Sequence, residues 1–232
     1  MLNRLLRPKL PALPPQKLRQ IADGAGTRLD LWSQFVQAAG IRRMAEIGVY
    51  RGDYAARLLA DADALRTYYM IDPWKHLADW NKPANKRDKQ FQRFFEETME
   101  KTEAWSGKRT VLRGRTADVV HGIPDRSLDF LYIDGDHTLR GITIDLVKAY
   151  EKVRPGGWVG GDDFSPTIWQ HGDEYEPTLV FPFALYFAEA VDAKVYGLPH
   201  RQFLIHKVPG FEFVDMTGRY EEADLLSQVA PR

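Results

Sequence analysis

Two short apolar runs that each end in acidic residues constrain the fold of this chain most. The first, residues 130–133, ends at Asp134-Gly135-Asp136-His137, and the second, residues 158–161, ends at Asp162-Asp163. The segment between them has helical spacing, so the order is strand, helix, strand. In such a βαβ unit the two parallel strands lie side by side and end at the same edge of the sheet. We therefore expect these acidic residues and His137 to gather there.

Composition excludes several classes of function. The 32 basic and 32 acidic residues cancel, so the chain has no overall charge that would attract nucleic acid or an anionic membrane. It contains no cysteine, which excludes disulfides, thiolate nucleophiles and cysteine metal sites. No apolar run is long enough to span a membrane, and residues 1–10 lack the apolar core of a secretory signal. We expect a cytoplasmic protein.

The chain is expected to form one large α/β domain with additions at both ends. Prolines at positions 8, 11, 14 and 15 interrupt an N-terminal arm, and residues 29–39 have the spacing of a packing helix that Gly40 ends. We assign residues 1–40 to this arm and helix, 41–210 to the catalytic domain and 211–232 to a C-terminal tail. The tail could form a cap or a dimer contact, so a homo-oligomer remains open.

A glycine-containing loop follows the first predicted strand, residues 44–47, and precedes a helix that begins near Asp53. Its pattern is Glu46-x-Gly48-x-x-x-Gly52, in which glycines let the backbone approach a ligand and the helix N-terminus is directed at it. It lacks the G-x-G-x-x-G spacing of dinucleotide-binding enzymes. The loop resembles motif I of class I S-adenosylmethionine-dependent methyltransferases. The alternative is a strand-to-helix turn that binds nothing.

Two further positions fit a cofactor site. A β-prone run, residues 67–71, ends at Asp72 about twenty residues after the glycine loop, where a carboxylate can accept both ribose hydroxyls; Asp72 could also cap a helix. Thr116 lies where methyltransferases of this class contact adenine, although capping of the helix that begins near Ala117 explains it more simply.

The run Ser-Leu-Asp-Phe-Leu-Tyr-Ile-Asp-Gly-Asp-His, residues 127–137, carries the strongest resemblance. It is similar to small-molecule O-methyltransferases related to macrocin O-methyltransferase and, more distantly, to catechol O-methyltransferase. The resemblance covers about residues 44–164 and implies a Rossmann-like, seven-stranded, mostly parallel, doubly wound sheet. It also implies that Asp134, Asp162 and Asp163 hold magnesium or another divalent cation, which also chelates two neighbouring hydroxyls of the acceptor. We also assign Asp134 to the cofactor site.

A base must remove the proton of the acceptor hydroxyl. The resemblance offers His137 or Asp136, and we favour His137 because an ordinary imidazole pKa suits proton abstraction near neutral pH. Asp134 and Asp136 could instead cap the following helix, residues 138–153. Without a cation or bound protons, however, so many acidic groups would repel one another.

Two loops are expected to cover the site. Residues 74–87 are polar and aromatic and are interpreted as a lid. The segment after the acid pair, residues 165–182, should lie over the acceptor pocket, with Trp169 and Tyr175 stacking on a ring and His171 binding a hydroxyl, although ordinary loop chemistry explains each equally well.

The sequence thus predicts an enzyme that transfers a methyl group from S-adenosylmethionine to an oxygen of a small acceptor with the help of a metal ion. A vicinal diol on a sugar, in a natural product or a surface polysaccharide, is the favoured acceptor, and a catechol is the next. Two alternatives are a metal-dependent enzyme of other chemistry, such as a hydrolase or an oxygenase, and a binding module that holds S-adenosylmethionine without catalysis.

Overall fold

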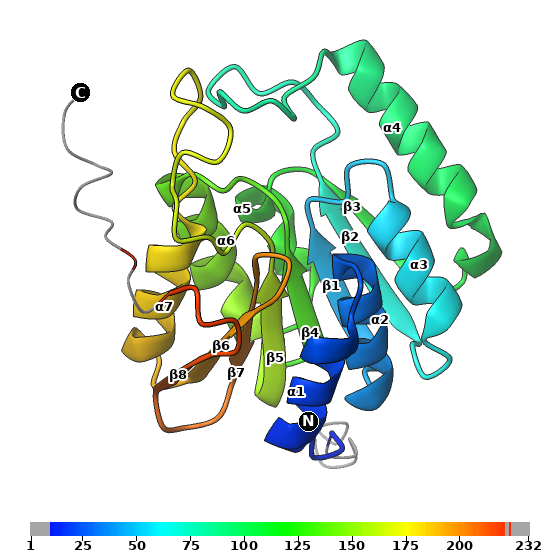
Figure 1. Ribbon diagram of the computed structural model, residues 1–232. Coiled ribbons are helices and arrows are strands. Elements are labelled where there is room, and N and C mark those ends of the chain that lie inside the picture. Colours follow the sequence, from blue (N-terminus) through cyan, green and yellow to red (C-terminus); the bar gives the residue numbers. More distant parts are fainter. Residues whose placement is uncertain (1–9, 221–222, 224–232) are drawn as a thin grey trace.

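The computed structural model describes residues 10–220 and Ala223, which form an α/β fold around one mixed sheet (Figure 1). The strands lie in the order β3-β2-β1-β4-β5-β7-β6-β8. Their bounds are β1 Arg43–Ile47, β2 Thr67–Asp72, β3 Arg109–Arg113, β4 Leu128–Ile133, β5 Val153–Gly161, β6 Lys194–Leu198, β7 Gln202–His206 and β8 Glu212–Asp215. The helices are α1 Pro15–Gly24, α2 Arg28–Ala38, α3 Asp53–Asp61, α4 Asp88–Lys101, α5 Thr116–Val119, α6 Leu139–Ala149 and α7 Val180–Ala190.

The strand directions confirm the predicted fold class. Strands β1 to β5 pair in parallel, and β7 pairs antiparallel with both β5 and β6. This arrangement is the class I methyltransferase fold that the sequence predicts, with one additional strand. The additional strand, β8, comes from the segment predicted as a tail and pairs in parallel with β6. The rest of that tail, residues 221–222 and 224–232, and residues 1–9 of the arm lie outside the described residues.

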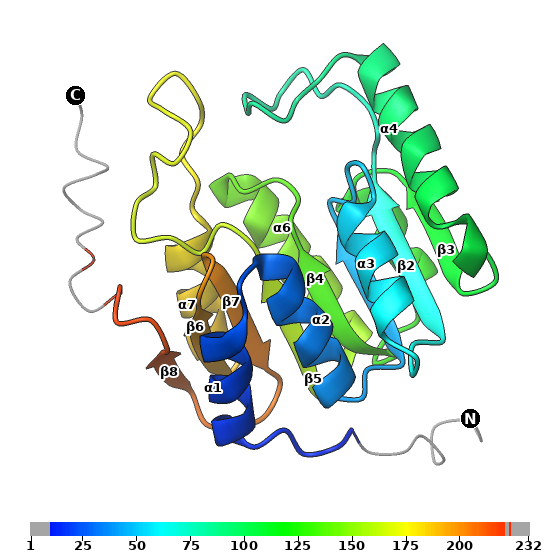
Figure 2. The same cartoon turned by 45° about the vertical axis from the view of Figure 1, so that its right-hand side comes forward.

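Helices cover both faces of the sheet because successive residues of each central strand point to opposite faces. In β4, Phe130 and Tyr132 pack in the core on one face, and Leu131 and Ile133 pack in the core on the other. The first core includes side chains of α1, α2 and α3, which lie in front of the sheet in Figure 2, and the second includes those of α6 and α7 behind it. The predicted doubly wound architecture is therefore present.

Strand register brings the acidic strand ends together. Ile133 of β4 pairs with Ile47 of β1 on one side and with Gly161 of β5 on the other. Since all three strands are parallel, the glycine loop, Asp134 and Asp162 leave the sheet at the same edge. None of the helices in the described part of the chain is long and apolar enough to span a bilayer.

Candidate active site

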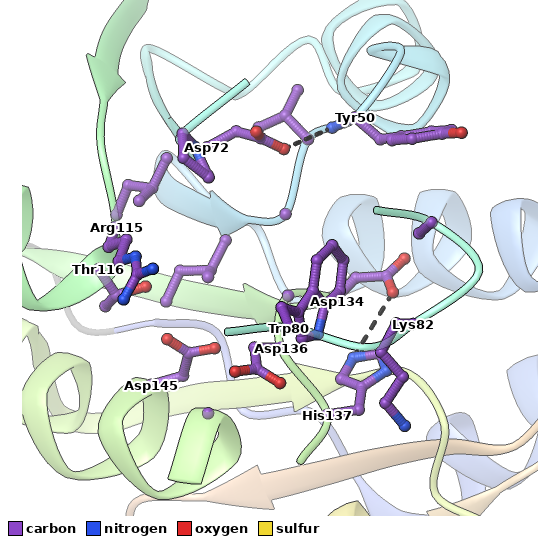
Figure 3. A pocket seen from close by; sticks show the side chains of 18 of the residues that line it. Tyr50, Asp72, Trp80, Lys82, Arg115, Thr116, Asp134, Asp136, His137 and Asp145 are labelled. Atoms are coloured by element: carbon purple, nitrogen blue, oxygen red, sulfur yellow. Dashed lines mark hydrogen bonds and ion pairs between the residues drawn. The ribbon is translucent and has the colours of Figure 1, made fainter. Parts of the chain in front are cut away.

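A pocket of about 760 Å³ opens at the carboxyl edge of β1, β2 and β4. Its walls combine the glycine loop, Asp72, the start of α5, the residues after β4 and β5, and the loop before α4 (Figure 3). The predicted cofactor, metal and base residues line it with the exception of Gly52: Glu46, Gly48, Asp72, Thr116, Asp134, Asp136, His137, Asp162 and Asp163. Gly52 is not among the lining residues, although its neighbours Arg51 and Asp53 are. Two halves predicted from separate motifs therefore share one cavity.

The glycine loop needs its glycines for conformation and for space. Gly48 has φ +87°, and Gly52, which precedes α3, has φ +74°. A Cβ placed on Gly48 would lie 1.9 Å from the backbone oxygen of Asp134. Any side chain at position 48 would thus push apart the loops that follow β1 and β4, so glycine keeps the cofactor loop in contact with the predicted acceptor side.

Asp72 connects the end of β2 to the glycine loop. Its Oδ2 accepts a hydrogen bond from the Tyr50 backbone N–H at 2.8 Å, and its Oδ1 accepts one from the Trp74 N–H at 2.6 Å. Burial raises the pKa of the Asp72 carboxyl, and these backbone donors oppose that shift. Each oxygen retains lone-pair capacity for a ligand hydroxyl. No helix begins directly after Asp72, so the alternative of a helix cap is wrong.

Thr116 does not cap α5, so the simpler interpretation of this residue as a helix cap is wrong. It lies inside the helix, whose N-cap is Arg115, and its side chain hydrogen-bonds to the Asp145 carboxylate of α6. Burial raises the pKa of Asp145 to about 7. The Oδ2 atom of Asp145 is buried and has no hydrogen-bond partner within the described part of the chain, although Asp145 and Thr116 both line the pocket (Figure 3). The two residues thus provide a polar wall where an unsatisfied acceptor remains.

Glu46 is buried in the sheet beneath the glycine loop. Its Oε2 accepts a hydrogen bond from the Tyr68 hydroxyl at 2.7 Å, and burial raises the pKa of its carboxyl to about 8. It reaches the pocket wall from β1. Its protonated form is therefore stabilised by the protein interior.

The cation between the acidic strand ends is an arginine. The Arg28 Nη1 atom, at the start of α2, donates to Asp134 Oδ2 at 2.8 Å and also binds Asp162 Oδ2. The other oxygen of Asp162 accepts hydrogen bonds from Gln202 Nε2 at 2.5 Å and from the Asp163 N–H at 2.8 Å. Burial raises the pKa of Asp134, and the positive charge of Arg28 opposes it. These interactions relieve the repulsion expected from the sequence.

His137 and Asp163 form a buried pair. The Nδ1 atom of His137 lies 2.7 Å from Asp163 Oδ2. Its Nε2 atom lies 3.7 Å from Asp134 Oδ1 and has no hydrogen-bond partner among residues 10–220 and 223. Burial opposes ionisation of Asp163, but the hydrogen bond and charge of His137 outweigh it and lower the pKa of this carboxyl to about 2. Burial opposes protonation of His137, but the hydrogen bond and charge of Asp163 outweigh it and raise the pKa of this imidazole. In the neutral form of His137 we assign the remaining proton to Nδ1, which faces the ionised Asp163, so that Nε2 carries the lone pair that a base needs.

The turn after β5 explains why Asp163 faces His137. Asp163 lies beyond the end of the strand, as predicted, and has φ +58°. Because of this turn, the two adjacent aspartates have different partners: Asp162 binds Arg28 and Asp163 binds His137.

Asp136 has a local role in the turn before α6. Its Oδ1 accepts a hydrogen bond from the Thr138 N–H at 3.0 Å. The N-cap of α6 is Thr138, whose hydroxyl accepts from the Gly141 N–H, so the alternative that Asp134 or Asp136 caps this helix is wrong. Among residues 10–220, no group of three or more histidine or acidic side chains is arranged to hold a metal ion. The predicted magnesium site stays a prediction, and the present arrangement does not match it.

The predicted lid contributes residues to the pocket wall and is tied through its middle to two other segments. Lys82 donates through Nζ to the Glu176 backbone oxygen at 2.6 Å and to Thr178 Oγ1 at 3.0 Å. Asp79 binds Arg115 at 2.6 Å. Trp80 and Lys82 of this lid line the same pocket as Asp134 and His137 (Figure 3). The lid therefore joins the start of α5 to the loop after β5 across the pocket.

The predicted acceptor residues are distributed unevenly. His171 lines the pocket, with its Nε2 atom 3.8 Å from Asp163 Oδ2. Trp169 and Tyr175 are partly buried on the same loop but are not among the residues that line this pocket. Their proposed stacking on an acceptor ring stays a prediction.

Sequence reasoning missed Arg28, Asp145 and Lys82. Arg28 had one signal: a positive charge in the first turn of a helix opposes the helix dipole, so a partner of opposite charge is expected. Asp145 interrupts the apolar face of α6, which marks a buried polar group. Lys82 had no signal beyond its place in the lid.

Comparison with known proteins agrees with this geometry. None of the proteins of curated function matches the sequence. In solved structures the chain is similar to an O-methyltransferase family protein from Burkholderia thailandensis, with TM-score 0.57 and 13% identity over 84% of this chain and 58% of the other. It is also similar to the O-methyltransferase TomG from Streptomyces achromogenes in complex with S-adenosylmethionine, with TM-score 0.52 and 17% identity over 86% and 82%.

A third similar structure is the O-methyltransferase from Bacillus cereus in complex with S-adenosylhomocysteine, with TM-score 0.52 and 16% identity over 85% of this chain and 84% of the other. At these identities the similarity establishes the fold. The family model described as a methyltransferase domain matches residues 45–164, more than half of the 232-residue chain. This chain belongs to that methyltransferase family and has the fold of its class I, S-adenosylmethionine-dependent members.

Proposed function

We propose that this protein transfers the methyl group of S-adenosylmethionine to a hydroxyl oxygen of a small acceptor. The observation that carries the proposal is the His137–Asp163 pair. His137 lines the same pocket as the glycine loop, and its buried Nε2 atom has no hydrogen-bond partner among the described residues. The similar structures named as O-methyltransferases support oxygen as the methylated atom. A vicinal diol of a sugar in a natural product or surface polysaccharide is the favoured acceptor.

The residues of the pocket fit the cofactor. Gly48 brings no side chain into the pocket wall, and Asp72 offers carboxylate oxygens to ribose hydroxyls. The unpartnered Oδ2 of Asp145 fits the amino group of adenine, beside Thr116. Glu46 supports the loop from below through Tyr68.

The chemistry requires a base and a positioned nucleophile. When bound, S-adenosylmethionine supplies an electrophilic methyl group on a positively charged sulfur. His137 accepts the acceptor's hydroxyl proton at Nε2 while the oxygen forms its bond to the methyl carbon, and the carbon–sulfur electron pair remains on sulfur. Asp163 holds the imidazole in the required tautomer and stabilises its positive charge. The lid and its Lys82 contacts exclude water from the pocket.

Magnesium assistance, expected from the sequence, is not included in this mechanism. The three carboxylates of the predicted site are already engaged, because Arg28 lies between Asp134 and Asp162 and Asp163 binds His137. A divalent ion would have to displace these partners. Asp136 remains the second candidate for the base, but its hydrogen bond to Thr138 favours a role in the turn.

The first experiment is calorimetry with S-adenosylhomocysteine, with added magnesium and again with a chelator. Binding in both conditions is expected. No binding in either would overturn the methyltransferase proposal, and metal binding without cofactor affinity would favour a metal-dependent enzyme of other chemistry.

The second experiment tests catalysis with a panel of sugar diols and catechols. His137→Ala should lower methyl transfer by about 10²–10⁴-fold, as for loss of a general base, and should retain affinity for S-adenosylhomocysteine. His121→Ala, at an exposed position outside the pocket, is the matched control. Cofactor binding without transfer to any acceptor would favour the non-catalytic binding module, and full activity of His137→Ala would rule out His137 as the base.

A further inference from the structure

Arg28 occupies the place where a cation is expected. Its Nη1 atom joins Asp134, which follows β4, to Asp162, which follows β5. The side chain is 39% exposed and lines the pocket. A cation thus lies between the two carboxylates that the sequence assigned to magnesium, and it comes from a helix outside the segment that matches the methyltransferase family.

The surroundings hold the carboxylates in this arrangement. Gln202 donates to Asp162 from Nε2, and its own oxygen accepts hydrogen bonds from Trp32 at 2.7 Å and Tyr132 at 2.9 Å. Both of these donors and Gln202 are buried. The orientation of Asp162 toward Arg28 is therefore fixed by a satisfied polar network and does not depend on a surface ion pair.

Arg28 also has donors to spare. A guanidinium carries five N–H groups, and Nη1 uses its two on Asp134 and Asp162. Among the described residues, Nε and Nη2 have no hydrogen-bond partner. Arg28 and His137 approach opposite oxygens of the same Asp134 carboxylate, at 2.8 and 3.7 Å. An acceptor hydroxyl at His137 Nε2 would therefore lie close to the remaining guanidinium donors.

We propose that Arg28 is the cation of the acceptor site and takes the place of a divalent metal, so that methyl transfer needs no added metal ion. This inference rests on the proposed function and adds to it how the acceptor is recognised. The remaining guanidinium donors bind the oxygen next to the one that His137 deprotonates, and the planar, always charged group suits two adjacent oxygens of a vicinal diol. The proton still goes to His137, and Arg28 keeps all of its own.

Arg57 provides a matched control. It lies on α3, is 43% exposed and also joins two carboxylates, those of Asp61 and Asp30, but it does not line the pocket. Arg28→Ala and Arg57→Ala each remove an arginine from a pair of aspartates. Only the first leaves two unpaired carboxylates at the proposed acceptor site.

The test measures Mn²⁺ binding to the chelator-treated full chain by electron paramagnetic resonance of the free ion, together with calorimetry of S-adenosylhomocysteine. Wild type and Arg57→Ala should bind Mn²⁺ weakly and alike. Arg28→Ala should bind it at least about tenfold more tightly, because two carboxylates without a counter-charge attract a hard cation. Arg28→Lys, which keeps the charge, should resemble wild type. All four proteins should bind S-adenosylhomocysteine.

Tight Mn²⁺ binding by wild type would overturn the inference on its own, and so would equal Mn²⁺ binding by wild type and Arg28→Ala. The first of these results needs only the wild type, so it can be obtained even if Arg28→Ala fails to fold. Failure of the proposed function looks different, because wild type would then not bind S-adenosylhomocysteine. With an acceptor in hand, activity of wild type should be unchanged by chelator, and millimolar guanidinium should restore part of the activity lost in Arg28→Ala. Strict dependence on added metal would also overturn the inference.

Discussion

Substitution of Gly48 by alanine tests how closely the cofactor loop and the loop after β4 are packed. The left-handed conformation costs about 1–2 kcal/mol for a residue with a Cβ. The new Cβ would lie 1.9 Å from the Asp134 oxygen and 2.4 Å from its carbonyl carbon. Both are backbone atoms, and the Asp134 N–H donates to the Ile47 oxygen at 2.8 Å. Separation of the loops adds about 1–3 kcal/mol for overpacking and about 1 kcal/mol for a weakened hydrogen bond.

The sum is a loss of about 3–6 kcal/mol in the free energy of unfolding, a large part of the stability of a typical domain. Two control variants separate the contributions. Gly156→Ala has φ +74° and no atom within 4 Å of the new Cβ, so it should lose about 1–2 kcal/mol from backbone strain alone. Gly107→Ala has neither problem and should be unchanged or more stable by up to about 1 kcal/mol.

The assay is urea unfolding followed by fluorescence, with the slope compared among variants so that midpoints report stability. Calorimetry of S-adenosylhomocysteine should show weaker binding for Gly48→Ala than for either control. If Gly48→Ala is no less stable than Gly156→Ala, the two loops separate without cost, and the close contact between Gly48 and Asp134 is not a constraint on the site.

Three further predictions concern buried charge and the lid. Glu46→Gln should flatten the pH dependence of stability. Because the pKa of Glu46 is raised from 4.5 to about 8 in the folded chain, its contribution to wild-type stability is fully present below pH 4.5 and is lost as pH rises to 8; the loss is about 3 kcal/mol at pH 7. Parallel wild-type and variant stability curves in urea unfolding from pH 5 to 8 would contradict this prediction. Asp163→Asn should lower turnover by about 10²–10⁴-fold with cofactor affinity retained, and turnover close to wild type would show that Asp163 does not orient the base. Lys82→Met removes the hydrogen bonds from the lid to Glu176 and Thr178, so it should speed amide hydrogen exchange across residues 76–86 by at least about tenfold. Lys89→Met, at an exposed position on α4, should leave this exchange unchanged. Equal exchange in the two variants would show that Lys82 does not anchor the lid.

The sequence predicted the parts of the site that depend on strand order. The apolar run of residues 130–133 and the acidic ends of two strands were enough to place Asp134 and Asp162 at one edge, since parallel pairing fixes where strands end. The glycine loop and Asp72 were also found in this way. These features are local patterns joined by one rule of topology.

The partners of those residues could not be predicted. Arg28 lies 106 residues before Asp134, and only packing of α2 on the sheet brings them together. Thr116 looked like a helix cap because the pattern does not show that Asp145, which lies on α6 beyond β4, needs its hydroxyl. Asp163 was assigned with Asp162 as a pair, but the positive φ of one residue turns it toward His137. Side-chain direction at strand ends is set by turns, which leave little trace in residue type.

The position of Arg28 has a consequence for how related chains diverge. The matched methyltransferase segment, residues 45–164, contains the glycine loop, His137 and both strand-end aspartates but not the helix that carries Arg28. Two homologues could therefore share the whole catalytic segment and still present acceptors with sites of different charge, because an exchange at the start of α2 changes that charge without disturbing the sheet. Acceptor preference would then be inherited with the N-terminal helix, and cofactor use with the central domain. An acceptor assigned to one relative from the central domain of another would therefore be wrong.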